Sequence, residues 1–321
     1  MKSIWREIIM AVIMGMILPG ITLNWAVERE YPEETQLREP GQTEPQVQLE
    51  MKLRKSDGSV ETMNMDEYLL GVILAELPST FEMEAKKAQS VAARTYARKA
   101  AVTGGKHRDG SVCANSACCQ AWISREDYLE KGGSSKAVEE AMAAVNATSG
   151  YVLTFEGELI EATYFSCSGG STEDAVAVWG TDYPYLRSVD SPGEEHAVHH
   201  SDTVYFTKEE FAGKLGLPLT GSPKNWIGTA TYTAGDGIHT LVIGGKTFSG
   251  TDLRSKLGLR STAFTMEADE KGITVTTRGF GHRVGMSQYG ADAMAMDGST
   301  WQEILTYYYT GATLELTNVA A

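Results

Sequence analysis

Apolar and polar positions along the chain predict two consecutive helices near its front. Residues 65–77 place Leu69, Val72 and Ile73 on one helix face, and residues 81–102 are rich in helix-forming Ala, Lys, Glu and Arg. Asn64 has the side chain of an N-cap, and Pro78 disfavours helical geometry in the residue before it. The pattern therefore predicts one helix over about 65–77 and another over about 81–102.

The rest of the chain alternates between short strand-like runs and a few helical stretches. Further helices are predicted over residues 128–148 and 301–309. Strands are predicted over residues 47–52, 59–62, 151–155, 160–166, 228–234, 240–243 and 272–277. Helices at the front and a mainly antiparallel sheet system behind predict the α+β class.

The N-terminal pattern differs from the rest. Residues 8–27 carry no charge and follow Lys2 and Arg6, which predicts a transmembrane helix with residues 1–7 in the cytoplasm. A cleaved signal peptide is the alternative, although no A-x-A site follows the apolar run. Residues 28–46 are rich in Glu, Pro, Gln and Thr and predict a polar linker. A single domain is then expected over residues 47–321, outside the cytoplasm.

Composition narrows the functional classes. The hydrophobic content of 42% over 321 residues suffices for a large folded core. The formal net charge of −14 argues against a nucleic-acid partner, which would require a basic surface.

Glu76 is the strongest catalytic candidate among the residues because of its place on a helix face. It continues the apolar face of Leu69, Val72 and Ile73, where an ionised carboxylate is costly to bury. Such an environment raises the pKa of a carboxyl group and suits it to general acid catalysis. The alternative is an exposed glutamate at a frayed helix end, and spacing alone favours that alternative.

Three of the four cysteines crowd into seven residues. His107, Cys113, Cys118 and Cys119 offer four nitrogen or sulfur ligands, as a closed tetrahedral zinc site requires. A disulfide from Cys113 to either neighbour is the alternative outside the cytoplasm. Four protein ligands predict structural zinc, because a catalytic zinc keeps an open position.

Two further polar clusters carry candidate binding groups. The glycines of the run at 166–171 permit close backbone approach, although a simple turn is the plainer interpretation. A second cluster follows Gly279 and lacks the Gly-Lys-Ser/Thr ending of a phosphate-binding loop. A serine hydrolase is disfavoured because the chain has no G-x-S-x-G motif.

Four segments together resemble the stage II sporulation protein D family of lytic transglycosylases. They are GVILAELPSTFEMEAKKAQSVAARTYA at 71–97, YFSCSGGSTE at 164–173, VWG and PYLRSV at 178–180 and 184–189, and GFGHRVGMSQYGA at 279–291. The chain departs from the family at Arg283, where glycine is usual.

The resemblance implies a role for Glu76 and for the groups around it. Glu76 stands at the position of the catalytic glutamate, which would protonate the leaving oxygen of the MurNAc–GlcNAc bond. The same group would then act as base on the muramoyl 6-hydroxyl and yield a 1,6-anhydro sugar. The substrate supplies its own nucleophile, so one carboxylate suffices where ordinary glycosidases use two. The residues implied in substrate binding are Arg94, Tyr96, Ser168, Gly169, Gly170, His282, Ser287, Gln288 and Tyr289.

The resemblance also implies a biological setting. The expected enzyme is a peptidoglycan lyase that acts on denuded glycan strands during forespore engulfment. It would be anchored in the mother-cell membrane as a single-pass protein and act with stage II sporulation proteins P and M. A non-enzymatic glycan-binding protein and a hydrolytic muramidase are the rival interpretations.

Overall fold

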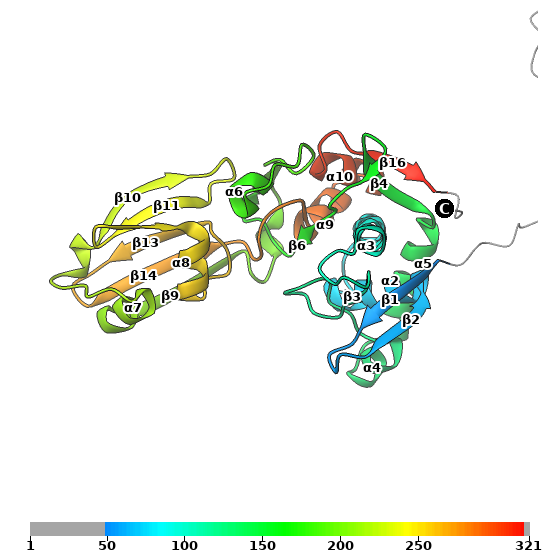
Figure 1. Ribbon diagram of the computed structural model, residues 1–321, viewed down its shortest axis with the longest axis horizontal. Helices are drawn as coiled ribbons and strands as arrows, with labels where there is room; N and C mark the ends of the chain where they lie inside the picture. The colour runs from blue at the N-terminus through cyan, green and yellow to red at the C-terminus, as the bar shows by residue number, and fades with distance from the viewer. Residues whose placement is uncertain (1–48, 318–321) are drawn as a thin grey trace, which may run out of the picture. The chain divides into compact units, whose positions relative to one another are not determined.

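The computed structural model describes residues 49–317, which form helices and small β-sheets around two hydrophobic clusters (Figure 1). β1 (Glu50–Arg54) pairs antiparallel with β2 (Val60–Asn64) and parallel with β3 (Val112–Cys113). The Asn64 side chain accepts a hydrogen bond from the Asp66 amide at 2.7 Å, which confirms the predicted N-cap of α2 (Met65–Glu76). Leu77 leaves the helix in an extended conformation, as Pro78 requires.

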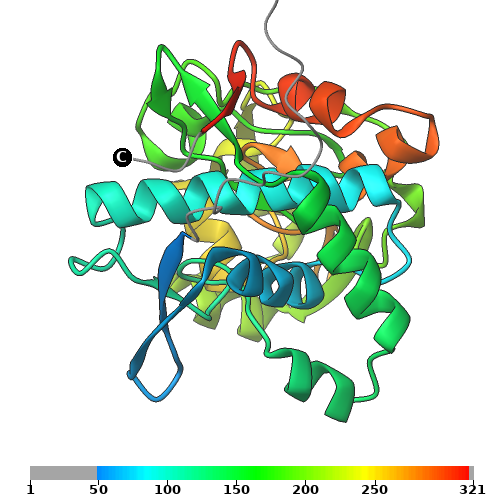
Figure 2. The same cartoon turned by 90° about the vertical axis from the view of Figure 1, so that its right-hand side faces the viewer.

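α3 (Met83–Thr103) is the central helix of the first hydrophobic cluster. Its small residues Ala85, Ala88, Ala92 and Thr95 are all buried, and they let other elements approach closely. α2, α5 (Ser135–Ala147), β4 (Tyr151–Phe155), α9 (Gln288–Met296) and α10 (Trp301–Tyr308) all contact α3. Figure 2 shows α3 in cyan running across the domain, with α2 below it and α10 above.

The helix predicted over 128–148 is two helices. α4 (Arg125–Glu130) ends before Gly132 and Gly133, and α5 begins after them. Gly132 has a φ of 93°, which a helix excludes, and a Cβ at Gly133 would lie 2.1 Å from the Tyr128 ring. The two glycines therefore break the helix that the flanking pattern favours.

Three small sheets and a short helix complete the part around the first cluster. β4 lies between β16 (Thr313–Leu316) and β5 (Glu158–Leu159). The strand predicted over 160–166 is reduced to β6 (Tyr164–Phe165), which runs parallel to β15 (Met286–Ser287) directly before α9. β7 (Gly170–Ser171) pairs with β8 (Asp190–Ser191), and α6 (Ala175–Trp179) lies between them in sequence.

The second hydrophobic cluster is built by the residues between β8 and β15. It packs around Phe211, Leu253 and Ile273, drawn at the left of Figure 1. One sheet has the order β13-β14-β9 and the other the order β10-β11-β12, all antiparallel. The elements are β9 (Ser201–Thr207), α7 (Lys208–Leu215), β10 (Ile227–Tyr232), β11 (Ile238–Ile243), β12 (Lys246–Ser249), α8 (Gly250–Leu257), β13 (Phe264–Ala268) and β14 (Gly272–Arg278).

A buried ion pair ties the second part to the first. Arg283 and Glu173 are both at most 1% exposed, and their side chains approach to 3.2 Å. The Arg283 guanidinium also donates to the carbonyl oxygens of Ser168, Ser171 and Gly235 at 2.6–2.8 Å. Gly235 belongs to the turn between β10 and β11, so one side chain holds both parts.

The Arg283 backbone has a φ of 66°, a left-handed conformation that glycine adopts readily. The guanidinium contacts therefore compensate a strained position where the family usually has glycine. The guanidinium is buried and adds no charge to the surface.

The predicted fold class is corrected at its N-terminal part. No helix among residues 49–317 is long and apolar enough to cross a membrane. The longest of them, α3, has 21 residues but includes charged Lys86, Lys87 and Arg94. The expected anchor at 8–27 lies outside the described residues. The fold is therefore described as mixed α+β, and the structure does not support the predicted single-pass membrane localisation.

We predict that Arg283→Met destabilises the protein by roughly 3 kcal/mol, because it leaves Glu173 buried without its counterion. The free energy of unfolding in urea measures this loss. Asp182→Asn is the matched control, because it breaks an exposed pair with Arg187 and should cost less than about 1 kcal/mol. Equal losses in the two variants would contradict the assigned role of Arg283.

Candidate active site

Glu76 is the last residue of α2, and two distant segments donate to its carboxylate. Oε1 accepts a hydrogen bond from the Ala121 amide at 2.6 Å, and Oε2 accepts one from Gln288 Nε2 at 3.2 Å. The side chain is partly buried. Three segments, α2, the stretch around Ala121 and the start of α9, therefore meet at one carboxylate.

Burial raises the pKa of Glu76, and the hydrogen bonds from Ala121 and Gln288 lower it by a smaller amount. The net pKa is above the ordinary value of a glutamate. A partly exposed carboxyl group with a raised pKa keeps its proton closer to neutral pH, as a general acid requires.

A series of side-chain hydrogen bonds near Glu76 positions the segment that contains the Ala121 amide. The Tyr68 hydroxyl donates to Gln120 Oε1, and Gln120 Nε2 donates to the Tyr164 hydroxyl at 2.8 Å. A Cβ at Gly71 would lie 2.2 Å from the Trp122 indole nitrogen, so only glycine lets α2 approach this segment. The sequence analysis missed Gln120 and Gly71, although a glycine inside a predicted helix is a signal of close packing.

α9 also fixes the turn that follows Glu76. The Phe81 and Tyr289 rings meet edge to face with centroids 4.9 Å apart. Asp292 Oδ1 accepts a hydrogen bond from the Glu82 amide at 2.7 Å. Gln288, Tyr289 and Asp292 therefore hold both the catalytic candidate and the turn after it.

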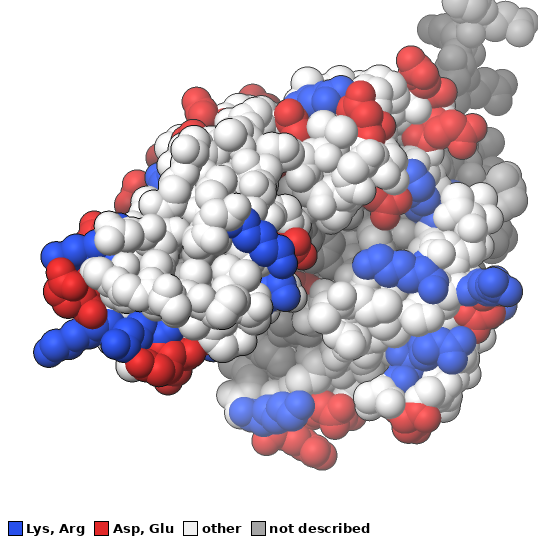
Figure 3. Space-filling view, turned by 60° about the vertical axis from the view of Figure 1, so that its left-hand side comes forward, with Lys and Arg blue, Asp and Glu red and all other residues white. Residues whose placement is uncertain are grey.

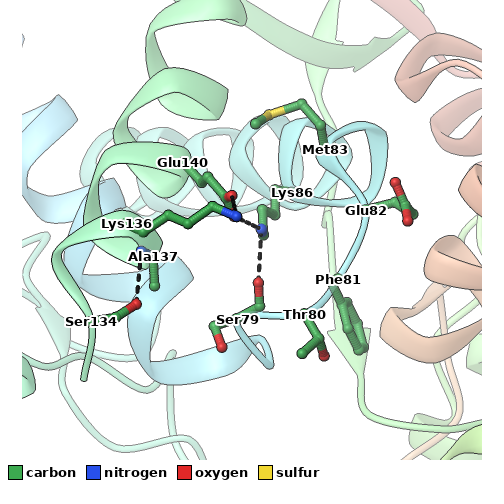
Figure 4. Close-up of a pocket in the computed structure, with 10 residues that line it drawn as sticks. All are labelled: Ser79, Thr80, Phe81, Glu82, Met83, Lys86, Ser134, Lys136, Ala137 and Glu140. Atoms are coloured by element: carbon green, nitrogen blue, oxygen red, sulfur yellow. Dashed lines mark hydrogen bonds and ion pairs between the residues drawn. The ribbon is translucent and has the colours of Figure 1, made fainter. Parts of the chain in front are cut away.

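On the other side of this turn lies a cavity of about 450 Å³ (Figure 4). Lys86 Nζ donates to the Ser79 carbonyl at 2.9 Å and pairs with Glu140 at 2.7 Å. Lys136 approaches the same carboxylate at 3.5 Å. Because the cations that line this cavity pair within its own walls, their evident role is to support the turn.

The predicted metal ligands lie together. The ligand atoms of His107, Cys113, Cys118 and Cys119 are all within 4.8 Å of one another. Cys118 Sγ lies 3.7 Å from His107 Nε2 and 3.8 Å from Cys119 Sγ. Zinc–sulfur bonds of about 2.3 Å in a tetrahedron separate two sulfurs by about 3.8 Å, whereas a disulfide requires about 2.05 Å. The donor set thus fits a tetrahedral ion.

The cysteine cluster directly precedes the segment that reaches Glu76. Cys119 is followed by Gln120 and Ala121, so any ion held by the cluster would restrain the amide that donates to the carboxylate. Although burial opposes it, hydrogen bonds from His107 and the neighbouring thiols lower the pKa of Cys113 to about 7. A thiol with this pKa is readily available as a thiolate ligand.

The structure places Arg94 and Tyr96 behind the site. Arg94 is buried and donates to the carbonyl oxygens of Thr148 at 2.7 Å and Val145 at 3.2 Å, at the end of α5. Tyr96 is buried beside Cys119, and burial raises its pKa. Both side chains are buried, so their contacts are those of supporting residues.

Ser168, Gly169 and Gly170 form a turn held by a residue that the sequence analysis missed. Glu194 Oε2 accepts hydrogen bonds from the Ser168 amide at 2.6 Å and the Gly169 amide at 2.9 Å. The Cys167 thiol donates to the same oxygen at 3.1 Å. Glu194 is 1% exposed, and nothing in its sequence context distinguishes it from the surface acids.

The predicted binding residues after Gly281 differ in their surroundings, since some pair with the backbone and one remains partly exposed. Ser287 is buried and caps α9 by accepting from the Gly290 amide at 3.2 Å. His282 Nδ1 accepts a hydrogen bond from the Val284 amide at 3.1 Å. Burial, with the charges of Arg254 and Lys106, lowers the pKa of His282 to about 4. Tyr289 remains partly exposed beside Glu76's partner Gln288.

Comparison with known proteins decides the family. A family model described as stage II sporulation protein matches residues 54–155, which include Glu76 and the cysteine cluster. Stage II sporulation protein D of Bacillus subtilis is 42% identical over 263 residues, covering 80% of this chain and 76% of that protein. The chain belongs to the stage II sporulation protein D family.

Two further relatives are similar to this chain. Stage II sporulation protein D of Bacillus amyloliquefaciens is 40% identical and covers 87% of this chain and 81% of its own length. The amidase enhancer of Bacillus subtilis is 29% identical over 77% of this chain, which spans 40% of that longer protein. The resemblance inferred from the four motifs is confirmed.

We predict that Glu76→Gln changes stability in a pH-dependent way. The folded pKa of Glu76 lies above its unfolded value, so the folded parent binds more protons between the two and loses stability as pH rises through that window. The variant lacks this loss, so its stability relative to the parent should grow across the window and then stay constant. Urea unfolding at a series of pH values measures this. A difference that is the same at every pH would contradict it.

Proposed function

We propose that this chain is a lytic transglycosylase that cleaves the MurNAc–GlcNAc bond of denuded peptidoglycan strands during sporulation. The observation that carries the proposal is the Glu76 carboxyl group, partly exposed at a helix end, with a raised pKa and two fixed donors. Family membership supports the sporulation setting.

One carboxyl group can serve both steps of this reaction. Protonated Glu76 gives its proton to the glycosidic oxygen as the bond to the anomeric carbon breaks. The resulting carboxylate then accepts the proton of the muramoyl 6-hydroxyl, whose oxygen attacks the anomeric carbon. The 1,6-anhydro bond forms, Glu76 recovers its proton, and no water is consumed. Ala121 and Gln288 hold the carboxylate in its ionised state between the two steps.

A second candidate function is non-enzymatic. One relative is named an amidase enhancer, which describes an effect on another protein's activity. On this view the chain binds glycan and assists a partner enzyme. The partnership with stage II sporulation proteins P and M stays a prediction.

Glu76→Gln should abolish release of anhydro sugars from purified denuded glycan strands, because the amide cannot donate or accept the proton. Product mass spectrometry measures this and also separates anhydro ends from the reducing ends that a hydrolase would leave. Glu67→Gln is the matched control, since Glu67 is an exposed residue of the same helix and should leave the product unchanged. Full release by Glu76→Gln would disprove the mechanism. Binding without cleavage by the wild type would favour the second candidate.

We further propose that His107, Cys113, Cys118 and Cys119 hold a structural zinc ion. The donor types and their spacing support it, and a bound ion would fix the segment before Ala121. With all four positions filled by protein ligands, the ion would supply rigidity and no open position for substrate.

Metal analysis of the full chain tests this proposal. We expect one zinc per chain and four titratable thiols after unfolding with a chelator, from the four cysteines of the sequence. Cys118→Ser should lose most of the zinc, whereas Cys167→Ala should retain it, because Cys167 lies against Glu194. Two titratable thiols and no metal would establish a disulfide in place of zinc.

A further inference from the structure

His196 places an imidazole ring against α9, beside the candidate active site. It ends the short 3-10 helix η2 (Glu194–His196), and α9 contacts this helix. The centroid of the His196 ring lies 5.2 Å from that of the Tyr289 ring, at an angle of 61°. Nε2 lies 3.4 Å from Asp292 Oδ2, and Nδ1 lies 3.0 Å from the carbonyl oxygen of Gly193. The His196 side chain is 36% exposed, whereas that of Asp292 is 2% exposed.

These contacts require a proton between His196 and Asp292. A carbonyl oxygen only accepts hydrogen bonds, so the nitrogen that faces Gly193, Nδ1, must carry a hydrogen. In a neutral imidazole Nε2 then has a lone pair, and this lone pair would face Asp292 Oδ2. An ionised carboxylate repels it unless Nε2 also carries a hydrogen. One proton therefore lies on Nε2 or on Oδ2, and the pair shares it.

The other charged groups around this pair are acids. Burial raises the pKa of Asp292, and the charge of Glu82 raises it further, whereas the Glu82 amide and His196 lower it. In η2 itself, Glu194 is buried and accepts backbone hydrogen bonds elsewhere, and Glu195 is exposed. Within residues 49–317, His196 is the cation that pairs with Asp292. Loss of the shared proton would therefore leave a buried carboxylate without its counterion, which is costly.

His196 contacts the two α9 residues that hold the turn after Glu76. Asp292 holds this turn through its other oxygen, which accepts the amide hydrogen bond described above. Tyr289 packs edge to face on Phe81 of the same turn and also contacts His196. The imidazole thus supports both contacts from outside.

The Tyr289 ring is partly exposed and suits contact with a sugar. Sugar rings present C–H faces that pack on aromatic rings. Figure 3 shows a hollowed face on which Lys and Arg side chains are interspersed with Asp and Glu. A surface of mixed charge does not attract a ligand through one overall field, so glycan binding would depend on individual contacts such as this ring.

We infer that His196 is a positioning residue, which shares one proton with Asp292 and thereby holds the Tyr289 ring and the turn after Glu76 in the arrangement that binds glycan. This inference rests on the proposed function. When the pH rises and the pair loses its proton, the Nε2 lone pair faces the carboxylate and His196 moves away from the Tyr289 ring. Glycan affinity then falls with rising pH for a reason that does not involve the Glu76 carboxyl group.

Binding of purified denuded glycan strands in a Glu76→Gln background tests this inference, because the catalytic carboxyl group no longer titrates. The pH series extends to both sides of about 6.5, where an ordinary histidine titrates. Affinity should fall by about fivefold from the acidic to the alkaline end, the size of effect expected from one aromatic contact.

Two variants remove the shared proton from opposite sides of the pair. Asp292→Asn keeps an oxygen for the Glu82 amide, and its own amide donates to a neutral Nε2 at every pH, so affinity should no longer change with pH. His196→Gln keeps a donor for Asp292 but has no ring and no titrating group, so affinity should be low and equally independent of pH. If one variant does not fold, the other still decides the outcome.

His239→Ala is the matched control, because His239 is an exposed histidine of β11. It should keep both the affinity and the pH dependence of the parent. A parent affinity that is constant across the pH series would overturn the inference, and so would the parent's pH dependence in either His196→Gln or Asp292→Asn.

The two proposals fail separately. If the wild type releases anhydro products but affinity in the Glu76→Gln background does not change with pH, the role of His196 is wrong and the reaction stands. If affinity follows the expected pH dependence but the wild type releases no anhydro product, the role of His196 stands and the reaction is wrong. Absence of any glycan binding would contradict both.

Discussion

The carboxylate of Glu76 imposes the constraint on which the site depends. A partly buried carboxyl group needs donors that stabilise its ionised form, yet too many donors would remove the raised pKa that makes it an acid. Here one backbone amide and one side-chain amide meet this need. Both come from segments far away in the sequence, so α2, the stretch after the cysteines and α9 must pack in one arrangement.

Much of the remaining structure keeps those segments in place. Tyr68 and Gln120 order the segment that contains Ala121, and Gly71 lets that segment lie against α2. Asp292 holds the turn after Glu76 from the other side. Buried polar groups of this kind are costly unless fully paired, so each fixes a single local arrangement.

Local signals were sufficient to predict the elements that surround Glu76. The N-cap at Asn64 and the stop at Pro78 define α2 because both act through adjacent backbone groups. The same reasoning wrongly predicted one helix over 128–148, because two glycines break the helix that the flanking residues favour. It also missed α9, although Ser287 is a local N-cap signal. It missed the Glu194 contacts because their partners are more than twenty residues away and leave no spacing to recognise. The family motifs predicted the candidate site, and the contacts distinguish its buried residues from its partly exposed ones.

Several residues of the four motifs are buried and contact the backbone. Arg94, Ser168 and Ser287 are each buried and pair with backbone groups, so they maintain the geometry of the site without facing a ligand. Trp179 differs from these residues because it is 40% exposed, with its ring 5.2 Å from that of His282. Exposure separates the two kinds of residue, since Tyr289 is partly exposed whereas Arg94, Ser168 and Ser287 are buried.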